Sequence, residues 1–350
     1  MAQDTRRRIQ FSAPGEAEVI TEEAPSPEAG EVRVRTRYSA ISPGTERLVY
    51  QGDVPSDLAA DASIEAFQDQ DLSYPISYGY ACVGEVEALG EGVERKWRGT
   101  RVFAFQPHTS RFVASPEALI RLPDSTDLQD AVMIPSLETA VNLVMDGRPL
   151  IGETVVVFGQ GVVGLLTVRL LSEYPLSTLV SVDPNAIRRE WSESLGAEAA
   201  ASITDLDDVE SVDLASASST EAPDDHLNRA DLVYELTGHP SVLNDAVQST
   251  GFSGRIVVGS WYGTKTAPID LGSHFHRSRM RIISSQVSTI APSLRGRWTK
   301  GRRMSVVLAL LSDVSPGRLI SDRFALQDAP TVYERLADDR SMLQPVFVYE

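Results

Sequence analysis

Three glycines near the middle of the chain have the spacing GxGxxG: Gly159, Gly161 and Gly164. An apolar run typical of a strand buried on both faces, 154–158, precedes them directly, and a helical apolar pattern begins at Val162. In such a turn the first glycine makes the bend, the second lets the backbone approach a pyrophosphate, and the third lets the helix pack close to the strand. The pyrophosphate then lies at the helix N-terminus, beside Val162 and Val163. The spacing predicts a dinucleotide site, although similar turns also occur without a ligand.

A carboxylate stands where an adenosine ribose would need one. Asp183 ends a second apolar run, 178–182, nineteen positions after Gly164, which is a separation typical of a side chain that binds the ribose hydroxyls. Because a carboxylate repels a 2′-phosphate, Asp183 favours NAD over NADP as the cofactor. Arg188 and Arg189 follow closely and would weaken this preference if they face the cofactor, but they would have no such effect on a solvated helix face.

Two further turns follow predicted strands. Thr237 with Gly238, and Gly259 with Ser260, each come at the end of an apolar run. Ligands of doubly wound sheets lie beyond the carboxyl ends of the strands. We therefore expect these four residues to face the cofactor's ribose and nicotinamide.

Strands and helices alternate around these residues. We expect strands at 153–158, 178–183, 232–236, 255–259 and 281–287 and helices at 162–173, 186–195 and 241–249, with an acidic, Ser-rich connection at 202–229. This alternation predicts an α/β fold with a doubly wound parallel sheet. The tail adds helices at 304–311 and 329–336 and a closing strand at 344–349.

The first 120 residues read instead as short strands separated by turns. The alternation of Val32 and Val34 with Arg33 and Arg35 indicates a half-buried strand, and the whole stretch predicts an all-β unit. Two other segments interrupt or follow it. A surface excursion with a short helix at 64–68 is expected between Gly52 and Pro75, and one helical stretch is expected at 127–147.

The amino-acid composition disfavours several classes of protein. In 350 residues the formal net charge is -17, which disfavours binding to nucleic acid or to anionic membranes and resembles the proteins of salt-loving microbes. Cys82 is the only cysteine, so the sequence offers neither a disulfide framework nor a four-cysteine zinc lobe. With no run of 18 apolar residues and no export signal, a cytoplasmic protein is expected.

Several motifs together resemble the medium-chain dehydrogenase/reductase superfamily over essentially the whole chain. They are ISPGTER at 41–47, YGYACVGEVEALGEGV at 78–93, the glycine turn, ELTGHP at 235–240 and RIVVGSWYG at 255–263, and ISPGTERLVYQG is most similar to the bacteriochlorophyllide dehydrogenase branch. The resemblance implies a GroES-like β-rich catalytic domain at 1–145, a Rossmann domain at 146–287 and a C-terminal return at 288–350. It also implies a homodimer with a nicotinamide cofactor and a small-molecule substrate.

Zinc members of this superfamily hold their catalytic metal with residues that are replaced here. Pro43 occupies the position of the cysteine, Tyr80 that of the histidine, and Pro135 or its neighbours that of the third ligand. Neither proline nor a neutral phenol is a plausible zinc ligand. His274 and His276 would point in opposite directions if extended, so no metal site is expected.

Without zinc, another group must donate the proton during hydride transfer. By resemblance, Thr45 matches a Ser/Thr that relays a proton, and the phenol of Tyr80 would lie near the reacting oxygen, unless Tyr80 is only a packed aromatic side chain. Glu138 lies on an apolar helix and is expected either as a site residue or, more simply, as the ion-pair partner of an arginine. Glu46 is expected to form a structural ion pair with Arg47, and His108 is expected at the surface.

A basic run, SLRGRWTKGRR at 293–303, stands out in this acidic chain. Such a run is most often a solvated face. Alternatively, Arg295 and Arg297 bind a carboxylate or phosphate of the substrate, since arginine favours bidentate capture of anions.

The leading interpretation is therefore a zinc-independent, NAD-dependent oxidoreductase acting on a secondary alcohol or ketone. Two alternatives stay open: an NADPH-dependent quinone or enone reductase, and a dinucleotide-binding protein that has lost catalysis.

Overall fold

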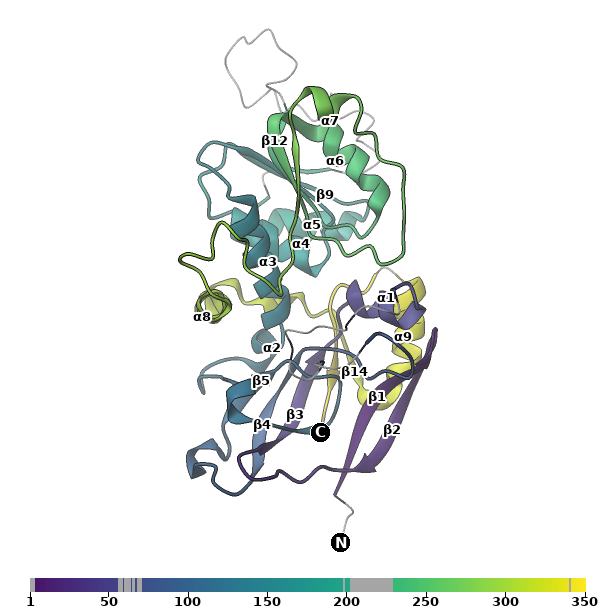
Figure 1. Cartoon of the computed structure of the whole chain (residues 1–350), viewed down its shortest axis with the longest axis vertical. Helices are drawn as coiled ribbons and strands as arrows, with labels where there is room; N and C mark the ends of the chain where they lie inside the picture. The colour runs from purple at the N-terminus through teal and green to yellow at the C-terminus, as the bar shows by residue number, and fades with distance from the viewer. Residues whose placement is uncertain are drawn as a thin grey trace. The chain divides into compact units, whose positions relative to one another are not determined.

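The computed structural model describes residues 4–55, 59, 64, 67, 71–197, 199–201, 229–339 and 341–350. The chain divides into two compact units, which we call unit 1 (Met1–Pro135 with Leu311–Glu350) and unit 2 (Ser136–Leu310) (Figure 1). The predicted excursion after Gly52, with its helix at 64–68, and the predicted connection at 202–229 lie largely outside the described residues.

Unit 1 is built on β-strands, as predicted. A hairpin of β1 (Thr5–Ala13) and β2 (Glu16–Glu23) accompanies a mixed sheet in the order β14-β15-β3-β4-β5-β7, with β6 also paired to β3. These strands are β3 (Val32–Ala40), β4 (Cys82–Leu89), β5 (Arg101–Ala104), β6 (Arg111–Ala114), β7 (Ile120–Arg121), β14 (Asp322–Ala325) and β15 (Pro345–Val348). In β3, Val32 and Val34 are buried while Arg33 and Arg35 are partly exposed, which confirms the predicted alternation.

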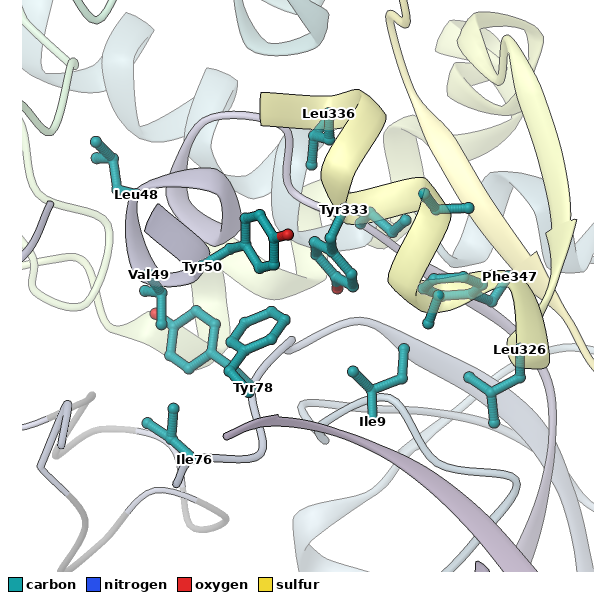
Figure 2. Close-up of a cluster of buried hydrophobic side chains, with 14 of the residues drawn as sticks. Ile9, Leu48, Val49, Tyr50, Ile76, Tyr78, Leu326, Tyr333, Leu336 and Phe347 are labelled. Carbon is teal, nitrogen blue, oxygen red and sulfur yellow. The ribbon is translucent and has the colours of Figure 1, made fainter. Parts of the chain in front are cut away.

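A hydrophobic core of unit 1 lies around two helices, α1 (Thr45–Gln51) and α9 (Ala329–Asp338). Figure 2 shows Tyr50 of α1 and Tyr333 of α9 directed toward one another, and their rings stack 5.6 Å apart. The ring of Phe11 packs edge-on against Tyr333 at 4.8 Å. The sequence analysis missed α1 because its seven residues are too few to display a helical period; Gly52, with φ of 75°, ends it in the left-handed conformation.

Unit 2 contains the predicted doubly wound sheet, with six parallel strands in the order β10-β9-β8-β11-β12-β13. They are β8 (Thr154–Phe158), β9 (Thr178–Val182), β10 (Ala199–Ala201), β11 (Ala230–Glu235), β12 (Thr250–Val258) and β13 (Arg281–Ser284). The helices that accompany them are α4 (Val162–Leu171), α5 (Ala186–Ser194), α6 (Leu243–Ser249) and α7 (His274–Arg277) (Figure 1). One sheet face packs its valines against α6, whereas Tyr234 on the other face lies against Gly147 of α3 (Ile134–Gly147).

Several predicted elements differ from the structure. The predicted helical stretch 127–147 is interrupted, since α2 (Leu128–Ala131) ends before α3 begins. Pro135 occupies the first turn of α3, where the backbone N–H has no partner within the helix and proline is tolerated. The tail helix is longer than predicted, because α8 spans Lys300–Val314. His274 and His276, for which only the extended case was considered, lie on α7.

Short 3-10 helices complete the described elements: η2 (Arg95–Trp97), η3 (Pro116–Ala118), η6 (Pro240–Val242), η7 (Pro316–Leu319) and η8 (Leu326–Asp328). Within the described part of the chain, no helix combines the length and the apolar character that crossing a membrane requires.

Candidate functional site: a dinucleotide cradle and a buried polar network

The glycine turn of unit 2 joins β8 to α4 and requires glycine at two of its positions. Gly159 has φ of 89°, and a Cβ there would lie 2.7 Å from backbone atoms of Leu236. A Cβ on Gly164 would lie 1.9 Å from the carbonyl oxygen of Gly159, so the helix could not pack so close to the strand. At Gly161, by contrast, a Cβ would meet no atom within 4 Å.

Open space at Gly161 coincides with the N-terminus of α4. Gly161 is the N-cap residue and has no side chain to cap the backbone N–H groups of the first turn, where Val162 and Val163 lie. These groups and the helix dipole favour an anion, so the turn fits the pyrophosphate of a dinucleotide.

Asp183 lies at the carboxyl end of β9 and is 5% exposed. One carboxylate oxygen accepts a hydrogen bond from the Gln160 backbone N–H at 2.7 Å, and the other accepts one from Asn185 N–H at 2.8 Å. Each oxygen keeps a further lone pair, with which it can accept a ribose hydroxyl. Asp183 thus fixes the glycine turn as well as fitting the predicted role.

The two arginines behind Asp183 both lie on α5. Arg189 donates to the backbone carbonyl of Asp183 at 2.8 Å, which ties its guanidinium to the end of β9. Arg188 is partly exposed and has an interaction partner.

A second cluster forms at the carboxyl ends of β11 and β12, around a residue that the sequence analysis did not select. Glu235 is fully buried and accepts hydrogen bonds from the backbone N–H and hydroxyl of Thr237 and, at 2.5 Å, from the Tyr262 hydroxyl. Burial and the Glu235 carboxylate raise the pKa of Tyr262, so the phenol keeps its proton and donates it. The only sequence signal for Glu235 was the motif ELTGHP, of which it is the first residue.

The residues predicted in the two turns after β11 and β12 lie close together around this cluster. The Ser260 hydroxyl accepts a hydrogen bond from Gly238 N–H at 2.9 Å, and Lys265 donates to the Gly238 carbonyl at 3.2 Å. A Cβ on Gly259 would lie 2.6 Å from the Leu236 side chain and 2.7 Å from that of Leu143, so both leucines would have to shift. The turns after β8, β9, β11 and β12 therefore lie along one edge of the parallel sheet.

In unit 1, Glu46 is the centre of a fully buried polar network. One carboxyl oxygen contacts His108 Nε2 at 2.8 Å and accepts a hydrogen bond from the Tyr333 hydroxyl at 2.5 Å; the other accepts one from Ser42 N–H at 2.7 Å. Glu46 thus pairs with His108, a partner that the sequence analysis did not name. His108 has no exposed surface, so its prediction as a surface histidine was wrong.

The network continues on the other side of the imidazole. His108 Nδ1 is 2.6 Å from the Ser39 hydroxyl, which is 2.8 Å from the Tyr349 hydroxyl. Burial raises the pKa of Tyr349, and burial together with the Glu46 carboxyl raises that of Tyr333, so both phenols stay protonated. Four separate segments of the chain are thereby tied to α1.

One of the two predicted proton donors adjoins this network in the sequence. Thr45 is the first residue of α1, adjacent to Glu46, and is partly exposed. Tyr80 is also partly exposed, and its ring lies perpendicular to that of Tyr78 at 6.3 Å. Both residues belong to unit 1, and the network fixes the first turn of α1 on which Thr45 lies.

Glu138 of α3 has the arginine partner that one alternative expected. Arg303 of α8 is fully buried and donates to Glu138 Oε1 from Nε at 3.1 Å and from Nη2 at 2.8 Å. Glu138 therefore forms the buried ion pair that this alternative expected.

Arg303 was predicted as part of the basic run, and the structure separates it from the others. Arg295 and Arg297 are exposed, while Arg302 lies over the Trp298 ring at 4.2 Å and donates to the Arg297 carbonyl. Arg295 donates to the Ile290 carbonyl at 3.0 Å, which leaves part of its guanidinium facing solvent. The run is thus a surface feature with one buried arginine.

Comparisons with known proteins bear on these arrangements. No protein-family model matches the chain. The chain is 27% identical over 302 residues to a 2-dehydro-3-deoxy-L-galactonate 5-dehydrogenase from Pseudoalteromonas atlantica, covering 77% of this chain and 80% of the relative.

Several solved structures match this chain over nearly its entire length. An alcohol dehydrogenase from Escherichia coli CFT073 complexed with NADH matches with a TM-score of 0.77 and 22% identity, covering 99% of this chain and 100% of the other. A dehydrogenase from Sinorhizobium meliloti 1021 bound to NADP matches with a TM-score of 0.75 and 18% identity over 99% and 100%. The chain has the fold of an alcohol dehydrogenase.

The resemblance described under Sequence analysis implies that Pro43, Tyr80 and Pro135 or its neighbours stand at the metal-ligand positions. This donor set does not fit zinc, which takes thiolate, imidazole or carboxylate ligands. Among the described residues, no group of three His, Cys, Asp or Glu side chains is arranged to hold a metal ion.

Proposed function

We propose that this chain is a zinc-independent, NAD-dependent oxidoreductase that interconverts a secondary alcohol and its ketone. The relatives are dehydrogenases and the fold is theirs, so the chain is an alcohol-dehydrogenase-like oxidoreductase with a nicotinamide cofactor. One observation carries the finer proposal. The glycine turn has glycine at the two positions that require it, whereas the positions matched by resemblance to the zinc ligands carry proline and tyrosine.

The chain's own residues must then bind the cofactor and move one proton. When bound, the nicotinamide supplies or accepts the hydride. The α4 N-terminus binds the pyrophosphate, Asp183 binds the adenosine ribose, and the turns at Thr237–Gly238 and Gly259–Ser260 border the rest of the cofactor. In the direction of reduction, the Tyr80 phenol donates the proton that the carbonyl oxygen gains, and the Thr45 hydroxyl relays a proton from solvent back to the phenolate.

The cofactor and metal assignments are tested together. Protein purified without chelators should contain less than about a tenth of an equivalent of zinc, and fluorescence titration at high salt should give tighter binding of NADH than of NADPH because Asp183 repels a 2′-phosphate. Stoichiometric zinc would overturn the metal-free mechanism. Preferential NADPH binding, with turnover of enones rather than alcohols, would instead identify a quinone or enone reductase, and tight NADH binding without turnover on any substrate would identify an inactive binding protein.

We further propose that the substrate is anionic and that Arg295 and Arg297 bind its charge. The relative from Pseudoalteromonas atlantica is named for a sugar acid, and both arginines are exposed on a basic segment of an acidic protein. Replacing both with alanine should raise KM for an anionic substrate by about tenfold or more, since each lost charge-assisted contact contributes about 1.5–3 kcal/mol, while cofactor affinity stays unchanged. Arg277→Ala, at an exposed arginine of α7, is the control. An unchanged KM in the double variant would exclude this role.

A further inference from the structure

Every hydrogen-bond donor of Arg303 is used inside unit 2. Besides the two bonds to Glu138, Nη1 donates to Asn142 Oδ1 at 2.5 Å and to the Thr289 carbonyl at 3.1 Å, and Nη2 donates to the Val287 carbonyl. A guanidinium has five N–H donors, and all five have acceptors. A cation buried so completely is costly unless it is paired, and Glu138 supplies the pairing charge.

Two of these acceptors belong to a turn that directly follows the last strand of the sheet. Thr289 N–H donates to the Gln286 carbonyl at 3.3 Å, which closes the turn 286–289 after β13. The same segment is tied to α3 at its start, because Ser285 donates to Asp146 at 2.7 Å and accepts from Asn142 at 3.0 Å. Arg303 thus joins α8, α3 and the turn 286–289.

The turn occupies a defined place along the cofactor edge. Asp183 follows β9, the glycines follow β8, and β13 lies three strands beyond β8 in the order β8-β11-β12-β13. At about 4.8 Å between strands, this places the end of β13 about 14 Å along the edge from the glycine turn, on the side away from Asp183. With the adenosine ribose at Asp183 and the pyrophosphate at the glycines, the nicotinamide half of the cofactor must extend toward the β13 side.

We infer that Arg303, paired with Glu138, is a positioning residue that holds the turn 286–289 against α3 and so shapes the nicotinamide half of the cofactor site. The inference rests on the proposed function, because it requires a nicotinamide dinucleotide in unit 2. Arg303 does not touch the cofactor in this scheme. It acts through the backbone carbonyls of Val287 and Thr289.

The test compares NADH with ADP-ribose, which lacks the nicotinamide, by titration calorimetry. Two variants are used. Arg303→Lys keeps the charge but loses the planar fork and two of the five donors, and Glu138→Met with Arg303→Met removes the pair while keeping an apolar core of similar volume, a replacement that proteins often tolerate. Arg302→Met, at the exposed arginine next in sequence, is the matched control.

In both variants the Kd for NADH should rise about tenfold or more, because small displacements of a positioning turn have large effects, while the Kd for ADP-ribose stays within about twofold of wild type. Arg302→Met should change neither. Equal losses for the two ligands, or unchanged NADH affinity in a folded variant, would refute the positioning role. A wild-type protein that bound neither ligand would overturn the proposed function as well, whereas a selective loss for NADH supports both.

Discussion

Tyr80→Phe should lower kcat by about 10²- to 10³-fold while leaving NADH affinity unchanged. The substitution removes only the hydroxyl, so the ring contact with Tyr78 is kept. If the phenol donates the proton to the reacting oxygen, its loss removes a stabilising interaction that forms in the transition state, and kcat and kcat/KM fall together. Steady-state kinetics at saturating NADH, with NADH titration of the same preparation, measure both quantities.

Tyr78→Phe provides the matched control, because Tyr78 is buried, lies two residues away and stacks on Phe67 with rings 5.3 Å apart. It should alter kcat by no more than a few-fold. Thr45→Ala should reduce kcat to a smaller extent than Tyr80→Phe, as expected for a relay rather than the donor. If Tyr80→Phe retained full activity, Tyr80 would be a packed aromatic residue and another proton donor would be required.

Glu46→Ala should destabilise unit 1 by about 3–5 kcal/mol, which is among the largest effects expected of a single substitution in this unit. Three groups lose their acceptor at once: the buried His108 Nε2 and Tyr333 hydroxyl and the partly buried Ser42 N–H. An unsatisfied buried donor costs about 1–3 kcal/mol, so these losses exceed the value of any exposed ion pair. Thermal unfolding followed by circular dichroism should show the midpoint fall by on the order of 10 °C.

Glu46→Gln should be less harmful, since the amide oxygen can still accept one of these hydrogen bonds. Glu117→Ala, at an exposed glutamate of the same unit, should change the midpoint by only a degree or two. A loss of less than about 1 kcal/mol in Glu46→Ala would mean that water replaces the carboxyl and that the network adds little to stability.

The sequence predicted the parts of the molecule that depend on residues close together in the chain. The strand, the glycines and the helix of the dinucleotide turn are contiguous, and Asp183 follows at a fixed spacing, so their local pattern predicted the arrangement that the structure contains. The same holds for the alternating strand β3. In each case the spacing of apolar residues along the sequence indicates the type of secondary structure.

The buried polar pairs could not be predicted in this way. Glu46 is 62 residues from His108 and 287 from Tyr333, and Glu138 is 165 from Arg303. A buried carboxylate on an apolar helix indicates that a partner exists, and for Glu138 that expectation was met, but only the folded chain selects which arginine it is. For His108 the polar neighbours in sequence were misleading, because its environment is set by β-strands and helices from both ends of the chain.

Unit 1 is assembled from two separate segments of the chain, and this affects how it folds during synthesis. Its core joins Ile9, Phe11 and Tyr50 near the beginning of the chain to Tyr333 and Phe347 near its end (Figure 2), whereas unit 2 is the uninterrupted segment Ser136–Leu310. During synthesis the first 135 residues therefore leave the ribosome well before α9 and β15 exist. Unit 2 can complete its core first. The apolar surface of the early strands lacks its partners from residues 311–350 until these are synthesised, so we expect unit 1 to depend on chaperones more than unit 2.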